Sequence, residues 1–130
     1  MLNRRTVIVG SLALLSTATV ISAKAQPVAT GPTELLMFDQ AGCPWCLRWR
    51  AEVGPGYPKS AEGRRAPLRT IDIGAPRPPG ITLASPVRAT PTFVLVENGR
   101  EIGRIVGYPG ADFFWSMLDG LMKKLTDSAG

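Results

Sequence analysis

The order of hydrophobic patterns along the chain constrains its fold most strongly. An apolar run over residues 34–39 and an alternating segment over residues 67–73 predict two strands. The residues between them have helical character, and two strands joined through a helical crossover pair in parallel. Further along, residues 92–97 and 100–106 flank the turn pair Asn98-Gly99 and predict an antiparallel hairpin. Because both kinds of pairing are expected in one chain, we predict an α/β sandwich with a mixed central sheet and flanking helices.

The crossover contains two predicted helices. Residues 43–53 predict a helix with Pro44 in its first turn, where a missing amide hydrogen is tolerated. Residues 57–65 predict a second, short helix after a Gly-Pro-Gly break. By contrast, residues 74–89 include four prolines and are predicted to be mostly loop.

The last predicted element is an amphipathic helix over residues 111–125. Its apolar side chains recur with helical spacing at Phe113, Phe114, Met117, Leu118, Leu121, Met122 and Leu125. We expect the aromatic run Phe113, Phe114 and Trp115 to pack in the core and at its rim.

The N-terminus has the pattern of an export signal. Arg4 and Arg5 precede an apolar or small-residue stretch over residues 6–21, and Ala23-Lys24-Ala25 fits the site at which signal peptidase cleaves. We predict a signal peptide at 1–25, a flexible leader at 26–33 and one domain at 34–130. The alternative is a retained anchor, but the stretch is shorter than the roughly 20 residues that span a bilayer comfortably. The paired arginines fit both a general secretory and a twin-arginine route.

Charge and composition exclude several classes of function. Loss of residues 1–25 lowers the formal net charge from +5 to +2, and the remaining chain has no long basic run, so neither nucleic acid nor an anionic membrane is an expected partner. The sequence contains no histidine, which excludes Ser-His-Asp hydrolases, Cys-His proteases and histidine-ligated zinc. It has no glycine-rich phosphate loop or dinucleotide fingerprint. We therefore expect no cofactor, and electrons must arrive through thiols.

The motif Cys43-Pro44-Trp45-Cys46 carries the predicted chemistry. It follows a strand and opens a helix, where free amides and the helix dipole lower the pKa of a thiol from roughly 8.5 into the range of about 3.5 to 7.5. Cys43, nearer the helix end, is the candidate nucleophile. Cys46 lies within one helical turn and is the candidate resolving thiol.

Two other interpretations of the cysteine pair are weaker. A zinc site needs a second pair of ligands, and the chain has no further cysteine and no histidine. A purely structural disulfide would close a very short loop and would restrain the unfolded chain little. A redox motif in an exported chain is the favoured interpretation.

The strand before this motif, the motif itself and Thr90-Pro91-Thr92 before a hairpin resemble the thioredoxin family over essentially the whole exported chain. The resemblance implies that Pro91 is cis, faces the cysteines and helps to bind substrate backbone, and that Thr90 contacts the substrate. A cis bond is plausible at an X-Pro step, and an ordinary trans proline opening the strand is the alternative.

A longer set of segments resembles the small periplasmic SoxS-type thioredoxins of bacterial sulfur oxidation. These segments are residues 38–46, 54–59, 62–69, 90–98, 107–110 and 113–115. The resemblance implies a periplasmic protein that reduces a disulfide or mixed disulfide on the sulfur-carrier protein of the thiosulfate-oxidation (Sox) pathway. We also expect the protein to be a monomer. A membrane thiol transporter is the implied electron donor. The alternatives are a general disulfide oxidase or isomerase, a cytochrome-maturation reductase, and a nonenzymatic binding module with a structural disulfide.

The chain departs from ordinary thioredoxin near the cysteines. Met37 stands where thioredoxin has a buried Asp that moves the resolving thiol's proton, so the acceptor is unassigned. Asp39 is a possible substitute, and a merely solvated Asp39 is the alternative. Trp45 is expected to be at least partly exposed and, with Pro44, to contact the substrate. Arg48 and Arg50 could favour the Cys43 thiolate or form a solvated helix face.

Overall fold

The computed structural model describes residue 10 and residues 33–125, so all of the predicted signal peptide except Gly10 lies outside the described residues. Residues 26–32 of the predicted leader lie outside them too, whereas Thr33 belongs to the first strand, one residue before its predicted start. The elements are β1 (Thr33–Asp39), α1 (Pro44–Glu52), the 3-10 helix η1 (Tyr57–Lys59), α2 (Ala61–Arg65), β2 (Leu68–Asp72), β3 (Thr92–Glu97), β4 (Arg100–Val106) and α3 (Ala111–Met122).

The strands form one mixed sheet in the order β2-β1-β3-β4. β1 pairs in parallel with β2 and antiparallel with β3, and β3 and β4 form the predicted hairpin. Asn98 and Gly99 close this hairpin with φ angles of 52° and 78°, the left-handed conformations that a tight two-residue turn requires. The predicted mixed α/β sandwich is confirmed.

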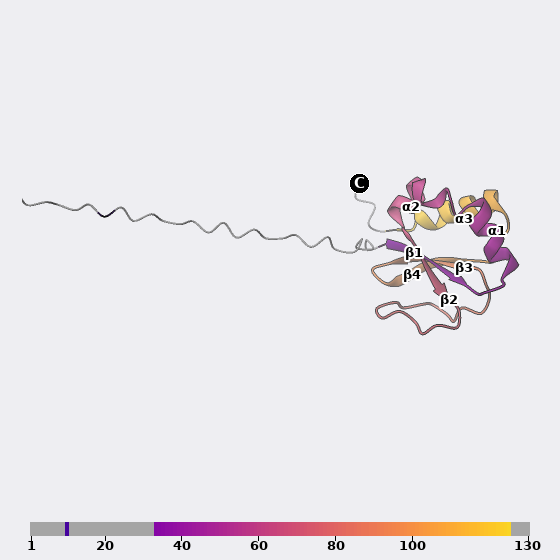
Figure 1. The fold of residues 1–130 in the computed structure, drawn as a ribbon, viewed down its shortest axis with the longest axis horizontal. Coiled ribbons are helices and arrows are strands. Elements are labelled where there is room, and N and C mark those ends of the chain that lie inside the picture. Colours follow the sequence, from indigo (N-terminus) through magenta and orange to yellow (C-terminus); the bar gives the residue numbers. More distant parts are fainter. Residues whose placement is uncertain (1–9, 11–32, 126–130) are drawn as a thin grey trace, which may run out of the picture.

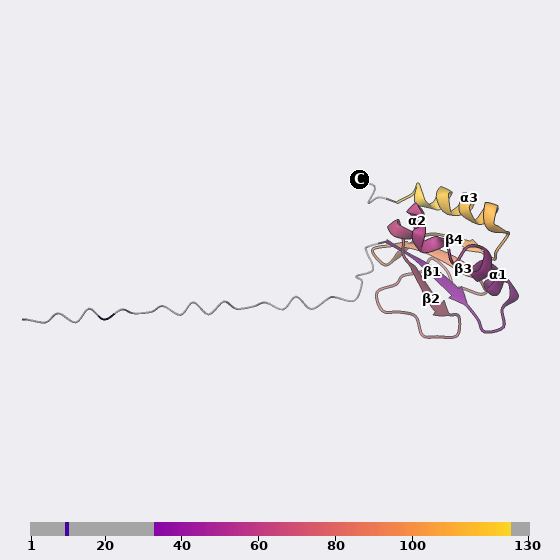
Figure 2. The ribbon, with the colours of Figure 1, turned by 45° about the horizontal axis from the view of Figure 1, so that its top comes forward.

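The three α-helices cover one face of the sheet (Figures 1 and 2). Beneath them, inward side chains of β1 and β3 meet those of α1 and α3 in one hydrophobic cluster. Trp49 is its centre, with ring centroids 5.1 Å from Phe93 and 5.6 Å from Phe114. This packing fixes α1 on the end of the sheet where β1 stops. Among the described residues, no helix is long and apolar enough to cross a bilayer.

The other face of the sheet is covered by residues 74–89, which form the predicted loop and run along the side opposite the helices (Figures 1 and 2). Ile81, Leu83 and Val87 from this segment pack on the second apolar cluster, which consists of Leu36, Phe38, Ile71, Val94 and Val96. Polar contacts hold the segment in place: the Thr82 amide donates to Gly99 O at 2.7 Å, and Arg104 donates to the carbonyl of Ser85 at 2.8 Å.

The predicted short helix over residues 57–65 is divided in the structure. η1 ends at Lys59 and α2 begins at Ala61, with Ser60 in an extended conformation between them. The Ser60 hydroxyl donates to Tyr57 O at 2.6 Å and accepts from the Gly63 amide at 2.9 Å, so it ends one helix and caps the next.

The terminal helix is shorter and less buried than predicted. α3 ends at Met122 rather than at residue 125, and it buries Phe114, Leu118 and Met122. Phe113 is 67% exposed and Met117 is 44% exposed, so the prediction that Phe113 packs in the core or at its rim was wrong. These two side chains lie about 100° around the helix from Phe114 and Leu118, and a helix that packs on one side buries one stripe only.

Candidate redox site

The site begins where β1 delivers the chain to α1. A turn over residues 40–43 follows the strand, with the Cys43 amide donating to Gln40 O at 3.2 Å. Gly42 has a φ of +79°, a conformation that glycine adopts without strain and that places Cys43 at the start of the helix. The predicted helix 43–53 is observed as Pro44–Glu52, with Cys43 and Val53 as its two caps.

Cys43 and Cys46 form a disulfide, with their Cα atoms 5.3 Å apart. Cys43 is the N-cap residue, and its Sγ accepts a hydrogen bond from the Cys46 amide at 3.2 Å. Pro44 has no amide hydrogen to offer in this first turn. The helix therefore directs its positive end and one specific N–H at the sulfur of Cys43, where negative charge would develop on reduction.

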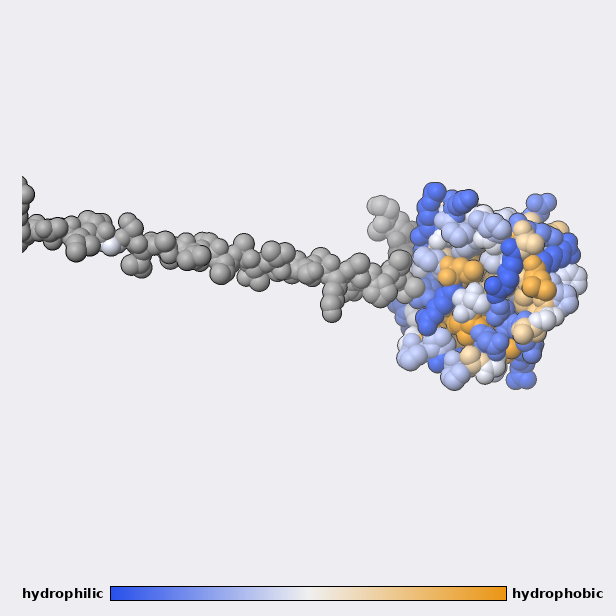
Figure 3. Space-filling view, in the orientation of Figure 1, coloured by the Kyte–Doolittle hydropathy of each residue, from blue (hydrophilic) through white to orange (hydrophobic). Residues whose placement is uncertain are grey.

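The two cysteines differ in depth, and the residues between them are exposed. Cys43 is 9% exposed and Cys46 is 2% exposed, so the first sulfur is the more accessible. Pro44 is exposed, and Trp45 is 52% exposed as predicted. Figure 3 shows hydrophobic surface among hydrophilic side chains at the end of the molecule that carries α1, where Leu47 is 63% exposed.

Thr90 and Pro91 stand at the start of β3. Their peptide bond is cis, which confirms the expectation from the thioredoxin resemblance and excludes the trans alternative. Pro91 is buried and Thr90 partly buried, and the Pro91 carbonyl accepts from the Gly107 amide at 2.7 Å. Thr92 pairs with Phe38 near the C-terminal end of β1. The turn that contains Thr90 and Pro91 therefore lies at the same end of the strands as the loop that leads to Cys43.

Asp39 is neither a free carboxylate nor a freely solvated one. It lies on the face of β1 that also carries Met37 and packs beneath α1, and its Oδ2 forms an ion pair with Arg50 from α1. Its side chain is 19% exposed. Arg50 thus ties the helix to the end of β1. Met37 itself is fully buried and has no group that could accept a proton.

A polar network near the cysteines was not predicted from the sequence. Tyr108 donates from its hydroxyl to Glu52 Oε2 at 2.5 Å, and Arg48 Nε donates to Glu52 Oε1 at 2.8 Å. The Arg48 guanidinium lies 5.6 Å from the ring centroid of Trp45 and 5.9 Å from that of Tyr108. The spacing of Trp45, Arg48 and Glu52 by three and four residues gave a signal for part of it. Tyr108 is 56 residues from Glu52 and gave none.

Hydrogen bonds and burial in this network shift the pKa values of Glu52 and Tyr108. The hydrogen bonds from Tyr108 and then Arg48 lower the pKa of Glu52 below its ordinary value of 4.5. Burial, followed by the hydrogen bond to the Glu52 carboxylate, raises the pKa of Tyr108 to about 12. Glu52 is therefore ionised and Tyr108 protonated at neutral pH, which are the forms that make these bonds.

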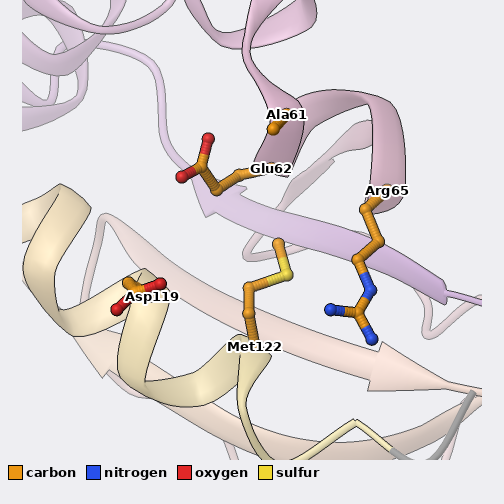
Figure 4. Close-up of a pocket in the computed structure, with 5 residues that line it drawn as sticks. All are labelled: Ala61, Glu62, Arg65, Asp119 and Met122. Atoms are coloured by element: carbon orange, nitrogen blue, oxygen red, sulfur yellow. The ribbon is translucent and has the colours of Figure 1, made fainter. Parts of the chain in front are cut away.

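A hollow of about 170 Å³ lies between α2 and α3, away from this chemistry (Figure 4). Its lining residues are Ala61, Glu62, Arg65, Asp119 and Met122, and no predicted site residue is among them. Within the described part of the chain, no group of three or more histidine, cysteine, aspartate or glutamate side chains is placed to hold a metal ion.

Comparison with solved structures supports the interpretation of the cysteine pair. The periplasmic thioredoxin SoxS from Paracoccus pantotrophus, in its reduced form, is 52% identical, with a TM-score of 0.70, and the match covers 71% of this chain and 97% of that one. A thioredoxin from Malassezia sympodialis, Mala s 13, is 21% identical with a TM-score of 0.47, covering 70% of this chain and 77% of that one. No family model and no curated protein matches the chain.

The SoxS match spans nearly all of a protein of the same architecture, at an identity far above the level at which fold alone is shared. Together with Cys43 and Cys46 at disulfide distance on a helix N-terminus, it favours redox chemistry over a nonenzymatic binding module. The chain belongs to the thioredoxin family, with its similarity to SoxS extending over most of its length, and it is a thiol–disulfide oxidoreductase.

Proposed function

We propose that the protein is a periplasmic disulfide reductase in which Cys43 attacks the substrate and Cys46 resolves the intermediate. The observation that carries the proposal is the cap of α1: Cys43 is the N-cap, is the more exposed of the two sulfurs, and accepts the amide hydrogen of Cys46. Charge that appears on Cys43 Sγ meets a donor that is already aimed at it, without reorganisation of the helix.

The reaction consists of two thiol–disulfide exchanges. The Cys43 thiolate attacks one sulfur of a substrate disulfide, forms a mixed disulfide, and releases the other substrate sulfur as a thiolate that takes up a proton. Cys46 then loses its proton and attacks Cys43 Sγ, which forms the disulfide seen here and releases the second substrate thiolate. The substrate gains two electrons, and a dithiol donor must return them to the protein.

Four residues are proposed to bind the substrate around this pair. Pro44 and Trp45 are exposed between the cysteines, and Thr90 and Pro91 lie at the end of the sheet where β1 leads to Cys43. An exposed indole and the backbone beside a cis proline suit an extended segment of a protein substrate rather than a small molecule.

The pathway assignment rests on similarity to the Paracoccus SoxS protein. We propose that the substrate is the sulfur-carrier protein of the Sox pathway, that a membrane thiol transporter supplies the electrons, and that the protein acts as a monomer. Periplasmic location is supported by the periplasmic SoxS match and by the signal-like segment at 1–25.

A trapping experiment tests this proposal. A Cys46→Ser variant expressed in the native periplasm cannot release its substrate from Cys43, so the mixed disulfide accumulates. We expect the sulfur carrier in the trapped complex, identified by mass spectrometry after nonreducing electrophoresis. The Cys43→Ser variant is the matched control and should trap nothing. Recovery of assorted folding clients without the carrier would overturn the pathway assignment in favour of a general oxidase or isomerase.

The reduction potential of the cysteine pair distinguishes a reductase from an oxidase. A reductase should have a potential towards about −270 mV, as thioredoxin does, whereas a strong oxidase lies towards about −120 mV with the disulfide isomerase between them. Equilibration of the Cys43–Cys46 pair against glutathione or dithiothreitol buffers measures it. A value near that of the oxidase would contradict the reductase assignment.

A further inference from the structure

The network at the side of α1 connects two distant parts of the chain. Tyr108 comes from the segment before α3, and its hydroxyl donates to Glu52 in the last turn of α1. Glu52 in turn holds Arg48 one helical turn nearer the cysteines. The Arg48 guanidinium then lies over Trp45, which stands between the two cysteines.

Arg48 has three partners in this network, although its own side chain is 52% exposed. Glu52 accepts its Nε hydrogen, and the rings of Trp45 and Tyr108 lie within 6 Å of the guanidinium carbon. Tyr108 is only 6% exposed, so the network is anchored on a buried side chain. Because Glu52 already balances the charge of Arg48, the network suits the positioning of a ring better than the binding of an anion.

Trp45 is the residue of this network whose side chain would have to be ordered when a partner binds. Its indole is 52% exposed, and the Arg48 guanidinium lies 5.6 Å from the centroid of its ring. A large side chain that must be ordered when a partner binds weakens the complex, and one that is already held in place does not. The same side chain matters little to a disulfide too small to reach it.

We propose that Tyr108, Glu52 and Arg48 are positioning residues that hold the Trp45 indole in one orientation beside Cys43 and so favour protein disulfides over small ones. This inference rests on the proposed function, because it assigns Trp45 a contact with the protein substrate. The titrations of Glu52 and Tyr108 agree with it, since both groups keep their bonding forms at neutral pH.

Kinetics with two oxidised substrates test the inference. Tyr108→Phe removes one hydroxyl and keeps the ring, and Arg48→Met removes the cation and keeps the aliphatic stem. For insulin disulfides we expect the KM of either variant to rise about two- to tenfold, the range that ordering one side chain accounts for. Turnover of the neutral small disulfide bis(2-hydroxyethyl) disulfide and the reduction potential should be unchanged.

Two further variants separate positioning from general damage. Lys123→Met breaks an exposed ion pair of the same i,i+4 spacing, Lys123 with Asp119, and should leave both substrates unaffected. Arg48→Lys keeps the cation but loses the planar guanidinium, and should recover part of the KM for insulin.

Fluorine NMR supplies a readout that does not depend on turnover. The chain has three tryptophans, so 5-fluorotryptophan gives three signals, and a Trp45→Phe variant assigns the one of interest. In Tyr108→Phe and Arg48→Met we expect that signal to move towards its position in the unfolded chain, while those of Trp49 and Trp115 stay in place.

The outcomes distinguish the two proposals. If the wild type reduces neither insulin nor the small disulfide, the proposed function fails. If it reduces both, but the variants keep the wild-type KM for insulin and the wild-type Trp45 signal, the positioning role is overturned. Equal losses on both substrates would also overturn it, because they would show general damage.

Discussion

At the scale of the residue, the chemistry depends on a few atoms that the first turn of α1 places together. The Cys46 amide points at Cys43 Sγ, and Asp39 holds Arg50 at the base of the helix. The cysteine pair on a helix N-terminus could be predicted from its spacing and from the strand before it. The order of attack remains a proposal. The contact of Asp39 with Arg50 joins two elements and has no sequence signature, because it depends on how α1 lies across β1.

Tyrosine titration tests the polar network at this scale. A phenol whose pKa is raised on folding stabilises the folded state fully below its unfolded pKa of about 10, and loses that contribution as the pH rises through its folded value. For Tyr108 the folded value is about 12. Burial also raises the pKa of Tyr57, the other tyrosine of the chain, well above its usual range.

We therefore expect little tyrosinate absorbance at 295 nm near pH 10.5 in the native protein, and much more in guanidinium chloride, where both phenols titrate near about 10. For Glu52 the pH dependence of stability has the opposite sign. Its contribution to the stability of the folded state is present above its ordinary pKa of 4.5 and is lost as the pH falls through its lowered pKa. A native tyrosine midpoint near 10 would show that the Tyr108 hydroxyl is not held as described.

At the scale of the element, hydrophobic spacing predicted the terminal helix α3 but not which stripe of it is buried. The spacing of Phe113, Phe114, Met117 and Leu118 describes an apolar face, of which α3 buries only the stripe that carries Phe114 and Leu118. The side of a helix that meets the sheet depends on where its partners lie, here Trp49 and Phe93 for Phe114. The division of residues 57–65 was readable in principle, since serine before Ala61 is a common N-cap.

Two neighbouring phenylalanines on α3 test this packing. Phe114 is fully buried among aromatic rings, so Phe114→Ala should lower the free energy of unfolding by about 3–5 kcal/mol. Phe113 is 67% exposed, so Phe113→Ala should change it by no more than about 0.5 kcal/mol. Urea denaturation of both variants measures the difference, and equal losses would mean that α3 is rotated relative to the structure described here.

At the scale of the whole molecule, the two faces of the sheet are covered by different kinds of structure. Helices lie on one face, and an irregular, proline-rich segment lies on the other (Figure 2). Its proline content predicted a loop correctly. The packing of this segment on the second apolar cluster was not predicted, because Ile81, Leu83 and Val87 stand among prolines without a helical period. This segment also leads directly to Thr90 and Pro91.

Arg104 is the polar anchor of this segment and provides a test at the same scale. It donates to the carbonyls of Ser85 and Pro86 and pairs with Glu101, with its side chain 17% exposed. Arg104→Met should lower the free energy of unfolding by about 1–3 kcal/mol, because it removes the hydrogen bonds to Ser85 and Pro86 and the ion pair with Glu101. Faster amide exchange should follow at Thr82 and Ala84. Lys123→Met is the control, and unchanged exchange in Arg104→Met would contradict the anchor role.

The acidity of Cys43 is the central claim, and the pH dependence of its alkylation measures it most directly. In the reduced Cys46→Ser variant, the rate of iodoacetamide labelling should reach half its maximum below about pH 7.5, because the α1 terminus favours the thiolate. In the reduced Cys43→Ser variant, the 2% exposed Cys46 should label slowly throughout. A midpoint for Cys43 near about 8.5, the value of a free cysteine, would contradict the account.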